Sequence, residues 1–165
     1  AERVPDDELV SAQHRRDLFE LARVEADHGI QLPVDLAALS RAIASHTWPV
    51  PVEVVACSAA VVNGRKGQLA AALENLVANA TAFAAAGTTV RIQVTGRRVT
   101  VANRGPTLSA AAQRKVWDRF YSTRTASGGT GLGLSIVRSV AIAHGGSVGV
   151  HCADGETAFW IELAA

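Results

Sequence analysis

The sequence predicts an α/β protein built as a two-layer sandwich, and two patterns support this prediction. Apolar residues recur at helical spacing along several stretches, most clearly over residues 66–86. Residues 90–94 alternate instead between apolar and polar side chains, and residues 95–98 turn the chain back as in a β-hairpin. Because both kinds of element must bury an apolar side, we expect a layer of helices packed on a sheet.

The first half of the chain begins with two predicted helices. Apolar residues recur among many charges over about 7–28, which is typical of an amphipathic helix. Pro33 cannot continue that helix and Asp35 favours a new start, so a second helix is expected over 34–46. A strand over 52–57 and a long apolar-periodic helix over 66–86 follow.

In the second half of the chain, the sequence predicts two further helices with strands before and after them. The hairpin strands are expected over 88–95 and 98–103, and a polar loop, the lid, over 121–130. The glycines after the lid lead into an apolar-periodic helix. The other predicted elements are helices 109–119 and 132–144 and strands 146–152 and 156–163.

Composition limits the kinds of partner. The chain has 165 residues and a formal net charge of +1, which suits one compact domain with an appendage and predicts no nucleic-acid binding. Cys57 and Cys152 show no metal-binding spacing and are expected to be reduced thiols. No apolar run is long enough to cross a bilayer, so the chain itself is expected to be soluble and cytoplasmic.

A glycine-rich stretch near the C-terminus predicts an anion site. Gly128, Gly129, Gly131 and Gly133 precede the helix that begins near Leu134. Glycines let a ligand approach the main chain closely, and the first N–H groups of a helix have no intrahelical partner. This loop is therefore suited to holding phosphate groups.

Two asparagines on the 66–86 helix form a second candidate motif. Asn75 and Asn79 are four residues apart, so both amides project from one helix face. An amide oxygen is a neutral ligand suited to Mg²⁺, which also binds nucleotide phosphates. Two solvated asparagines would give the same pattern, so the pair gains weight only from the other motifs.

Further motifs follow in order: Asn103-Arg104-Gly105 after a strand, Phe120-Tyr121 after a helix, and Gly155-Glu156-Thr157 near the end. In this order and at these intervals, the chain resembles the ATP-binding catalytic domain of sensor histidine kinases of two-component systems. These belong to the superfamily that also contains DNA gyrase B, Hsp90 and MutL. The resemblance implies the Bergerat ATP-binding fold, a mixed sheet with helices on one face, with ATP between the asparagine-bearing helix and the lid.

The resemblance also implies which residues bind ATP and Mg²⁺. Asn79 corresponds to the Mg²⁺ ligand of the family's N box, with Asn75 a second candidate, and Asn103 and Gly105 fall on the Asp-x-Gly motif that reads adenine. The implied ATP-binding set is Asn75, Asn79, Phe83, Asn103, Gly105, Leu108, Phe120, Tyr121, Arg124, Gly129, Thr130, Gly131, Leu132, Gly133, Leu134 and Thr157.

Three features depart from the family pattern. Asn103 replaces the usual aspartate; its amide oxygen can still accept from the adenine amine, but without the charge the bond is weaker. Ala82 removes a cation that usually follows the N box. The lid is short and carries Arg124, which is therefore the candidate for contacting the γ-phosphate and, with Asn75, the expected catalytic pair.

The absence of a general base predicts transfer rather than hydrolysis. ATPases of the superfamily carry a glutamate at the position of Asn75, and an amide cannot abstract a proton from water. The neighbouring Glu74 is rotated by about 100° around the helix. A neutral imidazole is already a nucleophile near neutral pH, so transfer to histidine rests on positioning and electrostatics.

The five histidines do not supply an acceptor. His14 lacks the family's acceptor pattern, and His144 is expected at a helix C-terminus that favours imidazolium. Residues 1–32 resemble the end of the second helix of the dimerisation and phosphoacceptor hairpin, and residues 33–165 resemble the catalytic domain. The chain is therefore expected to be a piece of a larger kinase that begins after the acceptor helix.

The parent kinase is expected to be a homodimer in the bacterial cell membrane. Its expected partners are its own hairpin and the receiver domain of a response regulator. Two alternatives stay open: a kinase-inactive nucleotide-binding regulatory module, suggested by Ala82 and Asn103, and an anti-sigma-factor-type serine kinase, which shares the fold. The helix that matches the hairpin argues against the serine kinase.

Overall fold

A five-stranded sheet forms the base of the fold. The computed structural model describes residues 6–26, 29–58, 60–121 and 131–164. In sheet order the strands are β2 (Val52–Cys57), β4 (Val90–Thr95), β5 (Arg98–Arg104), β7 (Glu156–Glu162) and β6 (Ser147–Ala153). β2 lies parallel to β4 and the other neighbours are antiparallel, which confirms the predicted mixed sheet.

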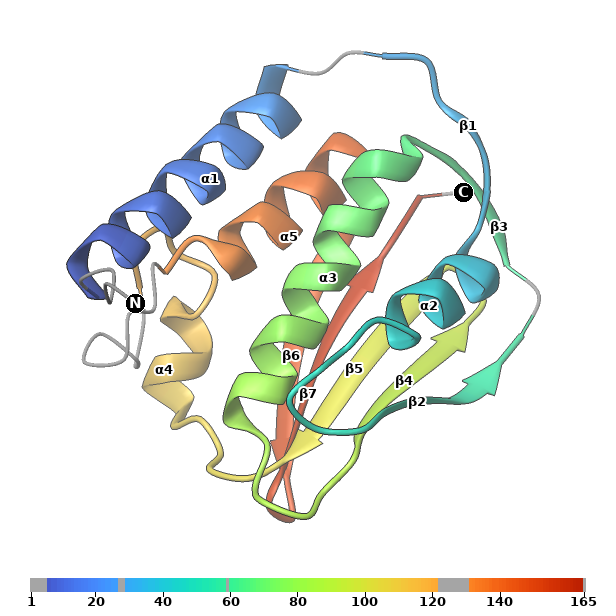
Figure 1. Cartoon of the computed structure of the whole chain (residues 1–165). Coiled ribbons are helices and arrows are strands. Elements are labelled where there is room, and N and C mark those ends of the chain that lie inside the picture. Colours follow the sequence, from blue (N-terminus) through green and yellow to red (C-terminus); the bar gives the residue numbers. More distant parts are fainter. Residues whose placement is uncertain (1–5, 27–28, 59, 122–130, 165) are drawn as a thin grey trace.

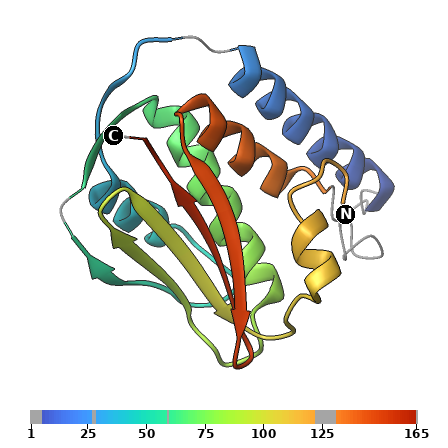
Figure 2. The same cartoon turned by 180° about the vertical axis from the view of Figure 1, so that it is seen from behind.

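The helices form the second layer. They are α1 (Asp6–Ala26), α2 (Leu36–Ala44), α3 (Lys66–Phe83), α4 (Ala110–Lys115) and α5 (Gly133–Ala143). Figure 1 shows α2, α3 and α5 on one face of the sheet, with α1 lying along α5. Seen from behind in Figure 2, the opposite face carries no helix of the described chain. The predicted two-layer sandwich with helices on one face is confirmed.

The core lies between these layers. Strand β4 buries Val90, Ile92 and Val94 and exposes the residues between them, as the alternation predicts. These side chains belong to one buried cluster with residues of α3 and α5 that are fully or almost fully buried: Leu69, Leu73, Leu76, Val77, Ile136, Val137 and Val140. Burying one such side chain contributes about 1.5–3 kcal/mol, so this contact fixes how α3 and α5 lie on the sheet.

A small antiparallel pair, β1 (Leu32–Asp35) with β3 (Val61–Gly64), was not expected from the sequence. The predicted helix 34–46 is wrong at its start, because residues 34 and 35 belong to β1. Val34 and Val62 face each other across the pair and are both buried. Asp35 does start the next helix, since its Oδ1 accepts hydrogen bonds from the N–H groups of Ala37 and Ala38 at 2.9 and 3.1 Å.

His144 ends α5 in a way that contradicts the expected imidazolium. The ring is buried, and its Nε2 accepts a hydrogen bond from the Arg65 N–H at 3.0 Å. An accepting Nε2 carries no proton, so Nδ1 holds the proton and donates to the Val140 carbonyl at 2.7 Å. The neutral ring thus ties the end of α5 to the turn between β3 and α3.

Helix α1 joins the domain through two buried residues, Leu21 and Val24, and the elements α1 and α5 are in contact. Its outer side exposes Leu18 and Phe19. Among the described residues, no helix combines the length and the apolar character that crossing a bilayer requires.

Candidate nucleotide-binding site

The N-terminus of α5 is an uncapped helix start. Its N-cap, Leu132, has a buried apolar side chain that makes no capping hydrogen bond, and the first turn contains no acidic residue. The first intrahelical bond runs from the Ile136 N–H to the Leu132 carbonyl, at 2.9 Å. The N–H groups of residues 133–135 therefore lack intrahelical acceptors at the positive end of the helix dipole, an arrangement that favours phosphate.

Asn75 of α3 lies directly beside this helix start. Its Nδ2 donates to the Ala71 carbonyl at 2.8 Å, which fixes the orientation of the amide. Its Oδ1 lies 3.0 Å from the position that a Cβ on Gly133 would occupy. Glycine at position 133 thus lets α3 and α5 approach each other closely at this point.

Phe120 and Gly131, at the two ends of the predicted lid, meet. The Phe120 N–H donates to the Gly131 carbonyl at 2.9 Å. Gly131 has a φ of +72°, and a Cβ there would come within 2.4 Å of the Phe120 carbonyl carbon. Phe120 also has a positive φ, 63°, and a largely exposed side chain. A backbone held in two such conformations is typical of functional segments.

The other end of the site contains a buried amide. Asn103 lies at the end of β5, opposite Thr157 of β7, and both side chains are buried. The Nδ2 atom of Asn103 is buried and has no hydrogen-bond partner in the described part of the chain. The Thr157 hydroxyl is 3.5 Å from the Cys152 sulfur on β6. A buried N–H without an acceptor is costly, so this atom marks a position where a ligand acceptor or water is favourable.

Gly105 brings the end of α3 to the end of β5. A Cβ on Gly105, whose φ is +153°, would lie 2.4 Å from the Phe83 carbonyl oxygen. Next to it, the Ala85 N–H donates to the Arg104 carbonyl at 2.7 Å. The helix therefore ends at Phe83, earlier than the predicted residue 86, because the chain leaves it to bond with β5.

The remaining predicted residues fall into two groups. Asn79 and Phe83 are half-buried on α3, and Leu108, Tyr121 and Leu134 are partly buried hydrophobic residues packed against the core. Arg124, Gly129 and Thr130 lie outside the described residues. The fold thus brings Asn75 to Gly133, Gly105 to Phe83, and Asn103 to Thr157.

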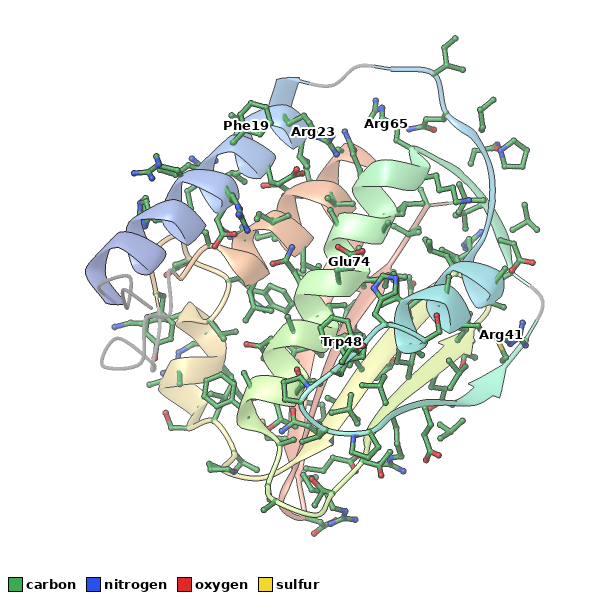
Figure 3. All side chains as sticks on the ribbon, viewed as in Figure 1. Phe19, Arg23, Arg41, Trp48, Arg65 and Glu74 are labelled. Atoms are coloured by element: carbon green, nitrogen blue, oxygen red, sulfur yellow. The ribbon has the colours of Figure 1, made fainter. Side chains whose placement is uncertain are left out.

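Helix α1 reaches the site, which the sequence did not predict. The ring of His14 stacks on Phe120 with centroids 5.8 Å apart and an interplanar angle of 16°. A pocket of about 400 Å³ between α1 and α3 is lined by Asn75 together with Phe19, Trp48 and Glu74. Figure 3 shows Glu74 on the outer side of α3. No local pattern encodes these contacts, because they join residues from distant parts of the chain.

The donor set is compatible with Mg²⁺ bound mainly through a nucleotide. The described residues contain no cluster of three histidine, cysteine, aspartate or glutamate side chains that would hold a metal alone. Asn79 offers one neutral amide oxygen, one helical turn after Asn75. Mg²⁺ commonly takes one or two protein ligands and completes its shell with water and phosphate oxygens, so the residues fit it.

The uncapped start of α5, the asparagines of α3 beside it and the buried amide of Asn103 lie in one α/β domain, an arrangement that is compatible with a bound nucleotide. Residues 64–165 match the family described as "Histidine kinase-, DNA gyrase B-, and HSP90-like ATPase". This match covers more than half of the chain, and the chain belongs to that family.

Sequence relatives point within this family to sensor kinases. The chain is 40% identical over 95 residues to the sensor-like histidine kinase SenX3 of Mycolicibacterium smegmatis, covering 53% of this chain and 25% of that protein. It is 35% identical over 106 residues to the sensor protein IrlS of Burkholderia pseudomallei, covering 57% of this chain and 22% of that protein. The chain spans about a quarter of the length of these relatives.

Solved structures agree. Full-length ShkA in complex with AMPPNP has a TM-score of 0.70 and 29% identity, covering 96% of this chain and 37% of that chain. The mycobacterial sensor histidine kinase MprB has a TM-score of 0.68 and 25% identity, covering 81% of this chain and 97% of that chain. These likenesses confirm the predicted sensor-histidine-kinase type of ATP-binding domain and do not favour the two alternatives.

Proposed function

We propose that this chain binds Mg-ATP as the catalytic domain of a sensor histidine kinase. The γ-phosphoryl group would pass to a histidine on a dimerisation hairpin and then to a response regulator, in a dimeric kinase of the bacterial membrane. The observation that carries this proposal is the close approach of Asn75 to the uncapped start of α5. A helix that would bind Mg²⁺ through its asparagines then lies beside a helix start that would bind phosphate, as a nucleoside triphosphate site requires.

Each end of the site has a distinct task. Asn103 and Thr157 would hold the base, and the backbone at Gly131 and at the start of α5 would hold the phosphates. Asn79 would be the Mg²⁺ ligand, with Asn75 beside it, and Arg124 would contact the γ-phosphate. Bound Mg²⁺ would neutralise charge on the phosphate oxygens. The solved likeness to ShkA, whose structure contains AMPPNP, supports nucleotide binding.

The chemistry expected here is transfer to an imidazole nitrogen. A nitrogen–phosphorus bond forms as the bond from the γ-phosphorus to the β–γ bridging oxygen breaks, and ADP leaves with that oxygen. Asn75 is fixed by Ala71 and cannot remove a proton, and Glu74 lies on the outer side of α3 (Figure 3). The amide of Asn75 would therefore not activate water, whereas a neutral imidazole attacks without such help.

The position of α1 supports the hairpin as the source of the histidine. His14 stacks on Phe120 at the start of the lid, and α1 packs on α5 through Leu21 and Val24. A helix in this place lies beside Phe120 and α5, where the phosphates would bind. If residues 1–32 are the end of a hairpin, the other helix of that hairpin would lie next to α1.

Calorimetric titration with AMPPNP tests nucleotide binding by the 165-residue chain. We expect micromolar affinity that falls at least tenfold without Mg²⁺ and at least tenfold in Asn79→Ala. The matched control is Asn63→Ala, which removes an exposed asparagine on β3 and should leave affinity unchanged. Absence of binding by the wild type, or unchanged binding by Asn79→Ala, would contradict the assignment.

Phosphotransfer is tested with radiolabelled ATP and a longer form of the protein that carries its hairpin. Phosphohistidine is acid-labile and stable to base, whereas phosphoserine is acid-stable. Acid-labile label on the hairpin would support the kinase. Tight ATP binding without any label would support the regulatory module, and acid-stable label on a partner would support the serine kinase.

A further inference from the structure

The base end of the site contains a hydrogen-bond donor where the related motif has only an acceptor. Asn103 is 3% exposed, and its Nδ2 is buried without a partner in the described part of the chain. The neighbouring side chain across the sheet, Thr157, is also buried, with its hydroxyl beside the Cys152 sulfur. The unpartnered donor therefore lies in a closed environment where an acceptor on a ligand would be strongly preferred to none.

The backbone around Asn103 is held in place, so the main motion left to its side-chain amide is a flip about the Cβ–Cγ bond. Residue 103 of β5 pairs with Thr157 of β7. Next to it, the Arg104 carbonyl accepts a hydrogen bond from the Ala85 N–H, and the Gly105 N–H donates to the Gly155 carbonyl. Rotation about the Cβ–Cγ bond exchanges Oδ1 and Nδ2 without moving that backbone. The same side chain can then present either an acceptor or a donor to a base.

Purines differ in what they present at this edge. Adenine carries an amino donor at position 6 beside the N1 acceptor, whereas a 6-oxopurine carries an oxo acceptor beside an N1–H donor. A carboxylate accepts only, so it matches the amine and opposes the oxo group. A carboxamide matches both, because its donor and acceptor can exchange places.

We infer that Asn103 relaxes the base selection of this site, so that it accepts 6-oxopurine nucleoside triphosphates as well as ATP. The inference rests on the proposed function, because it assigns the base to the Asn103 end of the site. Base selection is nevertheless a separate property from ATP binding, because binding ATP does not require the buried Nδ2 donor of Asn103. An aspartate at position 103 would restore strict preference for the 6-amino group.

The test compares the dissociation constants of ITP and ATP, each with Mg²⁺, for the 165-residue chain. ITP is the probe because it has the 6-oxo group without the 2-amino group of guanine. We expect a wild-type ITP-to-ATP ratio below about tenfold, and a rise of about tenfold or more in Asn103→Asp. Asn63→Asp, the same change at an exposed asparagine of β3, should leave the ratio unchanged.

The outcomes separate the two claims. A rise of less than tenfold in Asn103→Asp would overturn the inference while leaving ATP binding intact. A wild type that binds neither nucleotide would overturn the proposed function and this inference with it. Thermal unfolding shows whether Asn103→Asp folds; if it does not, the wild-type ratio decides, with a value above tenfold contradicting relaxed selection.

Discussion

The Oδ1 atom of Asn75 lies 3.0 Å from the place where a Cβ on Gly133 would stand. This contact joins α3, which bears both asparagines, to the first residue of α5. Any larger residue at position 133 would push on the Asn75 amide at the start of α5, where we propose that phosphate binds. Asn75 and Gly133, separated by more than fifty residues of sequence, are therefore neighbours in the fold, as the proposed site requires.

Gly133→Ala is expected to weaken nucleotide binding about tenfold, because the added methyl displaces the Asn75 side chain. Stability should change by no more than about 1 kcal/mol, since alanine is the better helix former. The matched control is Gly67→Ala near the start of α3, where a Cβ would make an ordinary 3.8 Å contact with Arg23. Calorimetric titration with AMPPNP measures the effect; equal affinities in the two variants would refute this role of Gly133.

Gly131→Ala is expected to separate the two ends of the lid. The variant must adopt a positive φ and also remove a 2.4 Å clash with the Phe120 backbone. Gly87→Ala is the control, because Gly87 has a similar φ of +76° with nothing within 4 Å. Gly87→Ala should lose about 1–2 kcal/mol of stability from the left-handed backbone, and Gly131→Ala should lose more because of the added clash. Nucleotide affinity should fall more than tenfold in Gly131→Ala and stay unchanged in Gly87→Ala. An equal loss of nucleotide affinity in both variants would contradict this role of Gly131.

His144→Ala is expected to lower the free energy of unfolding by about 2–4 kcal/mol, because it leaves the Arg65 N–H without its acceptor and opens a cavity. His151→Ala, at an exposed position on β6, should change it by less than about 0.5 kcal/mol. Urea unfolding followed by circular dichroism measures both. Similar small effects would show that the His144 bridge contributes little.

Leu21→Ala is expected to detach α1 from α5. Leu21 is buried, so truncation should cost about 2–4 kcal/mol, whereas Leu18→Ala on the exposed side of the same helix should cost far less. Hydrogen exchange of the α1 amides should quicken selectively in Leu21→Ala while the sheet stays protected. Unchanged exchange in α1 would mean that its contact with α5 does not hold it in place.

The sheet strands were the most predictable part of the fold from the sequence. β4 and β7 alternate in burial, and the observed ends of β4, β5 and β7 lie within two residues of prediction. β1 and β3 were missed because each is short and their pairing joins residues about thirty positions apart. Val34 pairs with Val62 across the two strands, a relationship that no local window of sequence contains.

The candidate site also has some features that the sequence indicated and others that only the fold reveals. Glycines and asparagines at family spacing pointed to Asn75, Asn103 and Gly133, and the fold brings their elements together. The stacking of His14 on Phe120 and the neutral state of His144 depend on tertiary contacts alone. The unpartnered Nδ2 of Asn103 likewise follows from burial on β5, whereas the sequence shows only that an amide replaces a carboxylate.

Hydrogen exchange of the 165-residue chain with and without Mg-AMPPNP tests the location of the nucleotide most directly. We predict slower exchange in the second half of α3, at residues 103–105, at 131–135 and at Thr157, with the β1–β3 pair unchanged. This pattern would show the nucleotide between Asn103 and the start of α5. Slower exchange confined to other elements, with none at 131–135, would contradict the account.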